Sequence, residues 1–190
     1  NGKGERKMAS PLADRIRPQT LDDIVGQRHL LAPGRALRRI IESGVIPNMI
    51  FYGPPGVGKT TLASLIARQT KRKLCKLNGT TASTADIREI VCGLDRIDAV
   101  NGILLYLDEI QYFNKKQQQT LLEFLEDGSI TMIASTTENP YFYVYGAILS
   151  RCTVFEFKSV EPSEVRRAVH RAFALLQEGE TPLVLEEGVE

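Results

Sequence analysis

This chain has few of the residues that build disulfide frameworks or metal centres. It contains three cysteines and two histidines among 190 residues. The cysteines are odd in number and form no C-x-x-C pair, which is the spacing typical of zinc and redox sites. We therefore expect reduced thiols in or near the core of a cytosolic protein, and no metal site built from cysteine or histidine.

Long apolar runs and a strong charge of one sign are also missing. No stretch approaches the roughly 20 apolar residues of a membrane-spanning helix, and no signal-peptide pattern precedes the folded region. We therefore expect no membrane partner and a cytoplasmic location. The formal net charge is +1 at pH 7, which does not by itself indicate nucleic-acid binding. A DNA contact would come from a local patch, from assembly or from further segments.

The most informative stretch of the chain is GPPGVGKT at residues 53–60, which satisfies the phosphate-binding pattern G-x-x-x-x-G-K-[ST]. An apolar run at 49–52 predicts a buried strand before it, and a helical pattern begins at Lys59. Backbone N–H groups and the dipole of a helix N-terminus bind phosphate oxygens. Lys59 would reach the β- and γ-phosphates, and the Thr60 hydroxyl would ligate Mg²⁺.

An accidental glycine-rich turn is the alternative, and the flanking strand and helix argue against it. The sequence therefore predicts a nucleotide-binding protein. The candidate phosphate-binding residues are Gly53, Pro54, Pro55, Gly56, Val57, Gly58, Lys59, Thr60 and Thr61.

Apolar strands alternate with helical patterns along the chain. Such alternation is typical of a parallel sheet covered by helices on both faces. The fold class we predict is α/β, a P-loop NTPase with a five-stranded parallel sheet between helices. The predicted strands are 49–52, 73–77, 102–107, 130–135 and 153–157, and the predicted helices include a short turn near 21–24, then 34–43, one from 59, 84–92, 115–126, 141–149 and 164–176.

Three regions are predicted along the chain. Residues 1–10 are polar at their start and contain glycine, so we expect a disordered lead-in. Residues 11–160 hold the predicted nucleotide-binding domain, with a boundary at Glu161. Residues 161–190 are too few to close a core alone, so we expect the beginning of a helical lid domain.

Two acidic residues, Asp108 and Glu109, end the apolar strand at 102–107. A carboxylate at the end of a strand beside a phosphate loop can hold a Mg²⁺-bound water. A second carboxylate directly after it can act as the base that polarises an attacking water. The pair therefore favours hydrolysis over transfer to another substrate. A solvated acidic strand end is the alternative.

Polar residues also follow the predicted strand at 130–135. Thr137 and Asn139 belong to the stretch TTENP at 136–140. The carboxyl ends of parallel strands face the ligand crevice, so either side chain could reach the γ-phosphate or the attacking water. A polar turn before Pro140 is the alternative reading.

Arg151 stands alone in an otherwise apolar stretch. It could be an arginine finger, a side chain that stabilises transition-state charge on the nucleotide of a neighbouring subunit. From the residues alone, a structural or surface arginine is the simpler reading.

Taken in order, these motifs resemble an AAA+ ATPase of the clamp-loader group, and more closely the replication-associated recombination protein A family, whose eukaryotic counterpart is the Werner-helicase-interacting ATPase. The resemblance covers about residues 11–160. The segments that carry it are Pro11-Leu12-Ala13, Arg17-Pro18, Gly26-Gln27, Phe113-Asn114-Lys115, Gln117-Gln118, Thr136-Thr137-Glu138-Asn139-Pro140 and Leu149-Ser150-Arg151-Cys152.

The resemblance implies a DNA-stimulated, Mg²⁺-dependent ATPase that converts ATP to ADP and assembles as a ring-like oligomer, a tetramer in bacteria. It implies action at stalled replication forks and at gapped or single-stranded DNA ends, alongside single-strand-binding protein. It also implies a bacterial, nucleoid-associated location in the cytoplasm.

By the same resemblance, Lys59 and Thr60 bind phosphate and Mg²⁺, and Asp108 belongs to the Mg²⁺ shell. Glu109 activates the attacking water. Arg151 becomes the arginine finger that acts on a neighbouring subunit, which reverses the simpler reading given above.

The remaining assignments carried over from the family concern the γ-phosphate sensor, the restraint on Glu109 and the adenine pocket. Thr137 is the expected sensor, with Asn139 next in preference. Asn78 is expected to restrain Glu109 until DNA binds. The residues expected around adenine are Arg17, Pro18, Val25 and Gly26.

The chain departs from the family pattern at Gln111, Tyr112 and Lys116, where the family usually has His, Arg and Ser. The family's Gly-Asp-x-Arg pattern, which carries a second sensor, does not occur in this sequence. Alternatives to the fork ATPase are a clamp-loader subunit or branch-migration motor, a scaffold that binds ATP with little hydrolysis, and a phosphotransferase.

Overall fold

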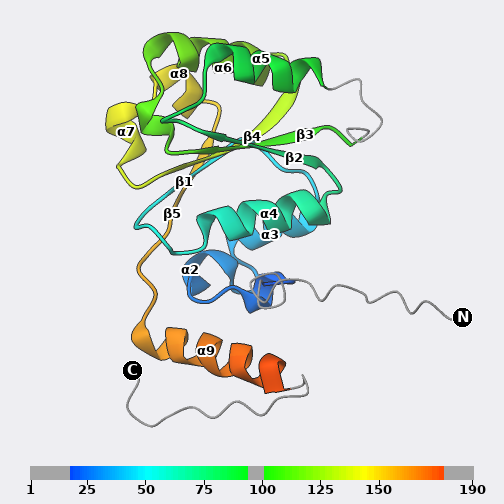
Figure 1. Ribbon diagram of the computed structural model, residues 1–190, viewed down its shortest axis with the longest axis vertical. Coiled ribbons are helices and arrows are strands. Elements are labelled where there is room, and N and C mark those ends of the chain that lie inside the picture. Colours follow the sequence, from blue (N-terminus) through cyan, green and yellow to red (C-terminus); the bar gives the residue numbers. More distant parts are fainter. Residues whose placement is uncertain (1–17, 94–100, 178–190) are drawn as a thin grey trace, which may run out of the picture.

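A computed structural model describes residues 18–93 and 101–177 of the chain. Its centre is a five-stranded sheet in the order β2-β3-β4-β1-β5, and all four strand pairings are parallel (Figure 1). The predicted fold class is confirmed, and each strand agrees with its predicted bounds to within one residue. The strands are β1 (Met49–Tyr52), β2 (Lys73–Asn78), β3 (Ile103–Asp108), β4 (Ile130–Thr136) and β5 (Thr153–Glu156).

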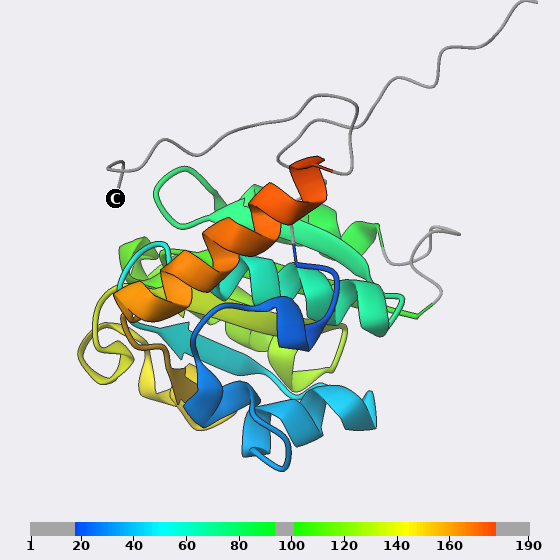
Figure 2. The same ribbon diagram turned by 90° about the horizontal axis from the view of Figure 1, so that it is seen from below.

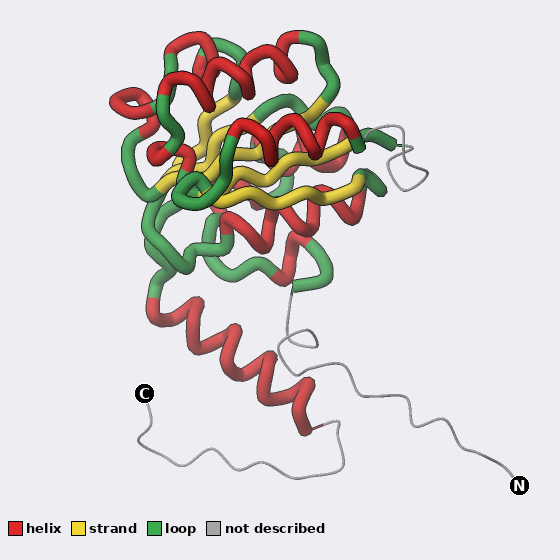
Figure 3. Tube along the Cα trace, turned by 45° about the horizontal axis from the view of Figure 1, so that its top comes forward, coloured by secondary structure: helices red, strands yellow, loops and turns green. Residues whose placement is uncertain are grey.

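Helices cover both faces of the sheet, because successive side chains of each strand point to opposite faces. Phe51 packs in a cluster with Leu62, whereas its neighbour Ile50 packs in a second cluster with Leu121. Figure 3 shows the sheet as the middle layer between two layers of helices. One layer contains α3 (Ala36–Ser43) and α4 (Lys59–Gln69), and the other contains α5 (Thr84–Cys92), α6 (Lys115–Glu126) and α8 (Gly146–Leu149).

The parallel register brings the predicted site residues to one edge of the sheet. Strand β1 lies between β4 and β5, and Tyr52 at its end is paired with Thr136 at the end of β4. Asp108 ends β3, which is the other neighbour of β4. The phosphate loop after β1 and the acidic pair after β3 therefore lie at the same carboxyl edge.

Two of the predicted helices begin at side-chain caps. Asn114 Oδ1 accepts a hydrogen bond from the Gln117 backbone N–H at 2.9 Å. Ser83 Oγ accepts one from the Asp86 N–H at 3.3 Å. Each side chain satisfies a backbone donor that has no partner within its own helix.

The single helix predicted over 141–149 is wrong, because the structure has two short helices there. Helix α7 (Pro140–Tyr143) and helix α8 are separated by Val144 and Tyr145. The backbone of Val144 is extended and its side chain is buried. The side chain of Gln118 provides hydrogen-bond partners for the backbone at this break. Its Nε2 donates to the Tyr143 carbonyl at 3.3 Å and its Oε1 accepts from the Tyr145 N–H at 2.7 Å.

Three further helical segments are only three or four residues long. The turn η1 (Leu21–Asp23) agrees with the helical turn predicted near 21–24. The segments α2 (Arg28–Leu31) and η3 (Ile110–Tyr112) were not predicted, because three or four residues are too few for a helical period to show.

After β5 the chain leaves the sheet and forms α9 (Pro162–Gln177). Figure 2 shows α9 lying across the face of the molecule that carries α2, α3 and α4. Glu164 of α9 forms an ion pair with Arg28 of α2 at 3.5 Å. The assignment of α9 to a separate lid domain stays a prediction, and the predicted lead-in at 1–10 lies outside the described residues.

Within residues 18–93 and 101–177, no helix is both long enough and apolar enough to cross a bilayer.

The three cysteines differ in how far they are exposed to solvent. Cys75 and Cys152 are half-buried, as expected for thiols near the core. Cys92 is exposed at the end of α5, so the expectation of a core or near-core position is wrong for this residue. Burial raises the pKa of the Cys152 thiol to about 12.

We expect a brief treatment of the folded protein with N-ethylmaleimide at pH 8 to label Cys92 well before Cys152. The thiolate is the reactive form, and a thiol with a pKa of about 12 forms little of it at pH 8. Mass spectrometry of the tryptic peptides measures the order of labelling. Denatured protein is the control, in which both thiols react at similar rates. Equal rates in the folded protein would contradict the assigned burial.

Candidate nucleotide-binding site

The loop between β1 and α4 has a backbone that depends on glycine. Gly53, Gly56 and Gly58 have φ angles of +141°, +74° and +95°, a region that side chains with a Cβ rarely adopt. A Cβ on Gly53 would lie 2.1 Å from the carbonyl oxygen of Phe157. The Gly53 N–H also donates to the Thr136 carbonyl at 3.1 Å. The start of the loop is thus held between the end of β4 and the segment after β5.

Lys59, the first residue of α4, folds back into the loop. Its Nζ donates to the carbonyl oxygens of Gly53 and Pro54, at 2.7 Å each, and the residue is 8% exposed. Desolvation lowers the pKa of the ammonium group, while the carboxylates of Glu109 and Asp108 act in the opposite direction. The loop is therefore curled around the Lys59 ammonium group, which the charges of the two acidic residues stabilise.

Gln27 is a site residue that the sequence reasoning did not assign. It is 4% exposed, and its side-chain amide exchanges two hydrogen bonds with the backbone of Lys158, at 2.7 and 3.0 Å. Its Nε2 also lies 3.5 Å from the Val57 carbonyl. Gln27 thus joins the phosphate loop to the segment after β5. Its partner is 131 residues away in sequence, so no local signal could show this contact.

Hydroxyl groups connect Thr60 to Asp108. The Tyr106 hydroxyl lies 2.9 Å from Thr60 Oγ1 and 3.4 Å from Asp108 Oδ1. Ser135 Oγ donates to the same carboxylate oxygen. Burial raises the pKa of the Tyr106 phenol, so this group is protonated at neutral pH. The two predicted Mg²⁺ ligands therefore belong to one hydrogen-bonded network.

The sequence reasoning missed Tyr106 and Ser135. The available signal was spacing, because residues i and i+2 of a strand share a face, and Tyr106 lies two residues before Asp108. A tyrosine in an otherwise aliphatic strand places its hydroxyl on the side of the sheet that α4 covers.

Glu109 lies just beyond β3 with a φ of +55°. Its Oε2 accepts a hydrogen bond from Gln111 Nε2 at 2.5 Å. Gln111 Oε1 is buried and has no hydrogen-bond partner among the described residues. Asn78, which was expected to restrain Glu109, instead accepts hydrogen bonds from the backbone and hydroxyl of Thr80, at 2.9 and 2.6 Å. The group that holds Glu109 in this structure is Gln111.

Gly79 supports the backbone of the acidic pair. Its N–H donates to the Asp108 carbonyl at 2.7 Å. A Cβ at this position would lie 2.1 Å from the Glu109 carbonyl oxygen. A glycine is required here because the chain after β2 passes against the backbone of Glu109.

The two candidate sensors lie beyond the end of β4. Thr137 is exposed at this edge, next to the buried Thr136. Asn139 caps α7, with its Oδ1 accepting from the Tyr141 N–H at 3.1 Å. Both residues follow the strand that lies between the phosphate loop and the acidic pair. Their roles as sensors stay predictions.

Arg151 lies at the opposite edge of the sheet. It precedes β5, whose first residue, Thr153, is paired with Met49 at the start of β1. The phosphate loop follows the other end of β1. The guanidinium donates to the Ala147 carbonyl at 2.9 Å and forms an ion pair with Glu126. Arg151 is therefore not part of the site that contains Lys59 of the same chain.

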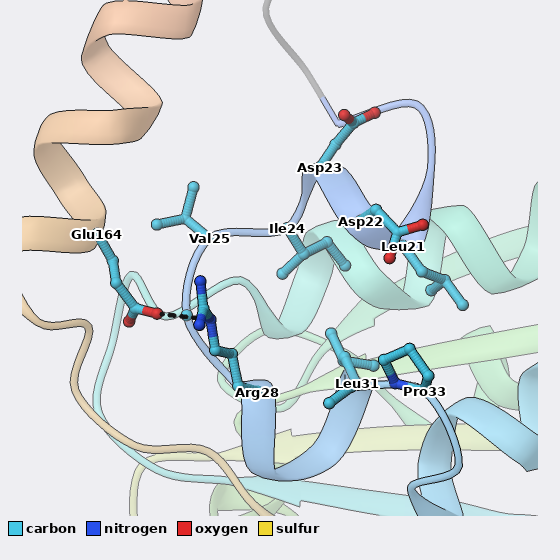
Figure 4. A pocket seen from close by; sticks show the side chains of 11 residues that line it. Leu21, Asp22, Asp23, Ile24, Val25, Arg28, Leu31, Pro33 and Glu164 are labelled. Atoms are coloured by element: carbon cyan, nitrogen blue, oxygen red, sulfur yellow. Dashed lines mark ion pairs between the residues drawn. The ribbon is translucent and has the colours of Figure 1, made fainter.

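The predicted adenine-binding residues separate into two places. Val25 and Gly26 line a cavity of about 490 Å³ between η1, α2 and the start of α9 (Figure 4). Pro18 instead lines a cavity of about 360 Å³ together with Thr60 and Thr61. Arg17 lies outside the described residues.

The larger cavity has an apolar interior and a charged rim. The ion pair between Arg28 and Glu164 stands at one side of it (Figure 4). Ile24, which also lines it, lies 3.8 Å from where a Cβ on Gly58 would be. The cavity therefore adjoins the phosphate loop, as a pocket for a nucleotide base must.

The oxygen atoms near the loop fit a magnesium ion. The part of the chain that the structure describes has no cluster of three or more His, Cys, Asp or Glu residues able to hold a metal. Mg²⁺ in nucleotide sites needs no such cluster, because it keeps several waters and binds one or two protein oxygens plus phosphates. The Thr60 hydroxyl has the chemistry of such a ligand, and the Asp108 carboxylate can accept hydrogen bonds from the waters of the ion.

The phosphate loop, the acidic strand end and the sheet order define a nucleotide-binding domain of the AAA class. Residues 49–160 match the family described as "ATPase family associated with various cellular activities (AAA)". The chain belongs to this family.

Within the family, the chain is similar to replication-associated recombination protein A of Escherichia coli (strain K12). The two are 42% identical over 163 residues, which cover 85% of this chain and 36% of that protein. ATPase WRNIP1 of Dictyostelium discoideum is 34% identical over 183 residues, covering 96% of this chain and 20% of that protein. The chain thus spans about a third of its bacterial relative.

A solved structure has a similar fold. It is the RuvB Holliday junction branch migration motor of Thermotoga maritima, with a TM-score of 0.71 and 27% identity. The alignment covers 86% of this chain and 55% of that chain.

We expect Gly79→Ala to impair ATP turnover of the full-length protein while nucleotide binding stays near wild type. The added methyl group overlaps the Glu109 carbonyl oxygen and must displace the acidic pair, and a displacement of about 1 Å can reduce a rate by roughly 100-fold. Phosphate release and the ATP dissociation constant measure the two effects. The control is Gly146→Ala, where a Cβ has open space. Unchanged turnover would show that this close approach does not position Glu109.

Proposed function

We propose that this chain is the ATP-hydrolysing domain of an oligomeric AAA+ ATPase that is stimulated by DNA and acts in replication-fork maintenance, recombination and repair. The observation that carries the proposal is the gathering of Lys59, Thr60, Asp108 and Glu109 at one edge of the sheet. The name of the similar bacterial protein, replication-associated recombination protein A, supports the assignment to replication and recombination. The name of the Dictyostelium protein, ATPase WRNIP1, supports the assignment as an ATPase.

ATP is the proposed nucleotide and ADP the product. The phosphates replace the carbonyl oxygens of Gly53 and Pro54 as partners of the Lys59 ammonium, and they accept backbone N–H groups from Gly56 onward, because Pro54 and Pro55 have none. The base occupies the cavity lined by Val25 and Gly26.

Thr60 and Asp108 hold Mg²⁺ in this proposal. A bound Mg²⁺ would neutralise charge on the β- and γ-phosphates. The protein provides the Thr60 hydroxyl directly and the Asp108 carboxylate as an acceptor for the water molecules of the ion.

Glu109 is the proposed base that orients and polarises the attacking water. It directly follows Asp108 at the carboxyl edge of the sheet, and its charge opposes the desolvation that lowers the pKa of Lys59, which supports a position near the phosphate loop. A base for water is needed for hydrolysis and not for phosphoryl transfer to another substrate. Thr137, or Asn139 next to it, is the proposed γ-phosphate sensor.

Arg151 is the proposed arginine finger for a neighbouring subunit. Its position at the far edge of the sheet supports action between subunits over action within one chain. The full-length protein is proposed to form a ring-like oligomer, a tetramer, on forked, gapped or single-stranded DNA, together with single-strand-binding protein. Its proposed location is the bacterial cytoplasm, in association with the nucleoid.

A second candidate function is an ATP-dependent scaffold with little hydrolysis. The hydrogen bond from Gln111 to Glu109 favours it, because one carboxylate oxygen of the proposed base is already engaged. A scaffold would bind ATP tightly and turn it over slowly whether or not DNA is present.

ATP turnover by the full-length protein, with and without forked or gapped DNA, distinguishes these functions. We expect DNA to stimulate turnover.

Glu109→Gln should bind ATP with near wild-type affinity and lose about 100-fold or more in turnover, since a positioned general base contributes about 100- to 10,000-fold to the rate. Lys59→Ala should lose nucleotide binding, because it removes the buried ammonium group from the loop.

Tight ATP binding with negligible turnover in both conditions would support the scaffold in place of the ATPase. Normal turnover by Glu109→Gln would remove its role as base. Unchanged nucleotide affinity in Lys59→Ala would overturn the phosphate-loop assignment.

We expect Arg151→Ala in the full-length protein to bind ATP normally and to reduce the activity of wild-type protein when the two are mixed. An arginine finger that acts on a neighbouring subunit is not needed for nucleotide binding in its own subunit. Such an arginine raises the rate of hydrolysis by about 1,000- to 100,000-fold. Phosphate release at increasing mutant fraction measures the effect. Arg39→Ala, at an exposed position of α3, is the control. If activity falls only in proportion to the fraction of wild-type protein in the mixture, the site is not shared between subunits.

A further inference from the structure

Tyr106 lies between the two groups proposed to hold Mg²⁺. It belongs to β3, is 2% exposed and packs on the face of the sheet that α4 covers. Its hydroxyl oxygen is 2.9 Å from Thr60 Oγ1 and 3.4 Å from Asp108 Oδ1.

The direction of these hydrogen bonds follows from the chemistry of their partners. An ionised carboxylate only accepts, so the Tyr106 O–H donates to Asp108 Oδ1. The Tyr106 oxygen is then the acceptor for the Thr60 hydroxyl proton. The proton of Thr60 Oγ1 therefore points into the protein.

This direction suits a metal ligand. A hydroxyl binds a cation through a lone pair, so its proton has to point away from the ion. Thr60 Oγ1 makes no other hydrogen bond within the described ranges, and Thr60 is exposed at the start of α4. On the carboxylate, Ser135 and Tyr106 both bind Oδ1, which leaves Oδ2 for a water of the ion.

We propose that Tyr106 is a positioning residue that orients the Thr60 hydroxyl and the Asp108 carboxylate to receive the divalent cation of a bound Mg²⁺–ATP. This inference rests on the proposed Mg²⁺-dependent ATP hydrolysis. It goes beyond that proposal by giving a function to a buried side chain that contacts both proposed Mg²⁺-binding residues.

The test is Tyr106→Phe, which keeps the buried ring and removes only the hydroxyl. The dissociation constant of ATP is measured for the full-length protein in excess Mg²⁺ and again in EDTA. We expect the value in Mg²⁺ to rise about three- to tenfold, as the loss of one hydrogen bond predicts, and the value in EDTA to stay within about twofold. The Mg²⁺ concentration for half-maximal turnover should rise in parallel.

Two further variants separate positioning from packing. Tyr52→Phe removes the hydroxyl of a half-buried tyrosine at the end of β1 and should leave both dissociation constants unchanged. Thr60→Ala removes the group that Tyr106 orients, so adding Tyr106→Phe to it should weaken Mg²⁺–ATP binding by less than Tyr106→Phe does alone. A purely structural tyrosine would show equal effects in both backgrounds.

Each result supports or overturns the proposal. Equal weakening in Mg²⁺ and EDTA, or no weakening in either, overturns the positioning role while the proposed ATPase stands. Wild-type protein that binds ATP no better with Mg²⁺ than without it overturns the proposed use of the ion, and with it this inference. If Tyr106→Phe is less stable, the rise in its melting temperature with Mg²⁺–ATP, relative to ATP in EDTA, gives the same comparison within one variant.

Discussion

The close approach of Gly53 to Phe157 is the constraint on which the site depends. Gly53 donates to the end of β4, lies against the carbonyl of the segment after β5, and accepts the Lys59 ammonium through its own carbonyl. One residue without a side chain therefore connects two strand ends to the loop that receives phosphate. Gln27 strengthens this connection through Lys158. The shape of the loop is thus held by tertiary contacts as well as by its own glycines.

The site also depends on how its carboxylates are restrained. Asp108 is held by two hydroxyl groups, whereas Glu109 is held by the amide of Gln111, whose oxygen is buried without a partner among the residues that the structure describes. An unpaired buried acceptor costs about 1–3 kcal/mol. The hydrogen bonds around Asp108 are therefore satisfied. Around Glu109, a small movement of Gln111 that gave its amide oxygen a donor would lower the free energy.

Much of the fold could be predicted because its signals are local. The phosphate loop and the five strands follow from residue patterns within short stretches of the chain. The contacts that complete the site are not local: Thr60 meets Tyr106 across 46 residues and Asp108 meets Ser135 across 27. The break between α7 and α8 was missed for the same reason, because Gln118 on α6 satisfies its backbone.

The separation of Arg151 and Lys59 to opposite edges of the sheet has a consequence for assembly. If Arg151 acts on a neighbouring subunit, each subunit contributes Arg151 from one side and its nucleotide site from the other. Such a heterologous, head-to-tail contact repeats in one direction and is complete only when it closes into a ring. The catalytic unit would then be the junction between two chains, and specific activity would fall steeply as the protein is diluted below its assembly concentration.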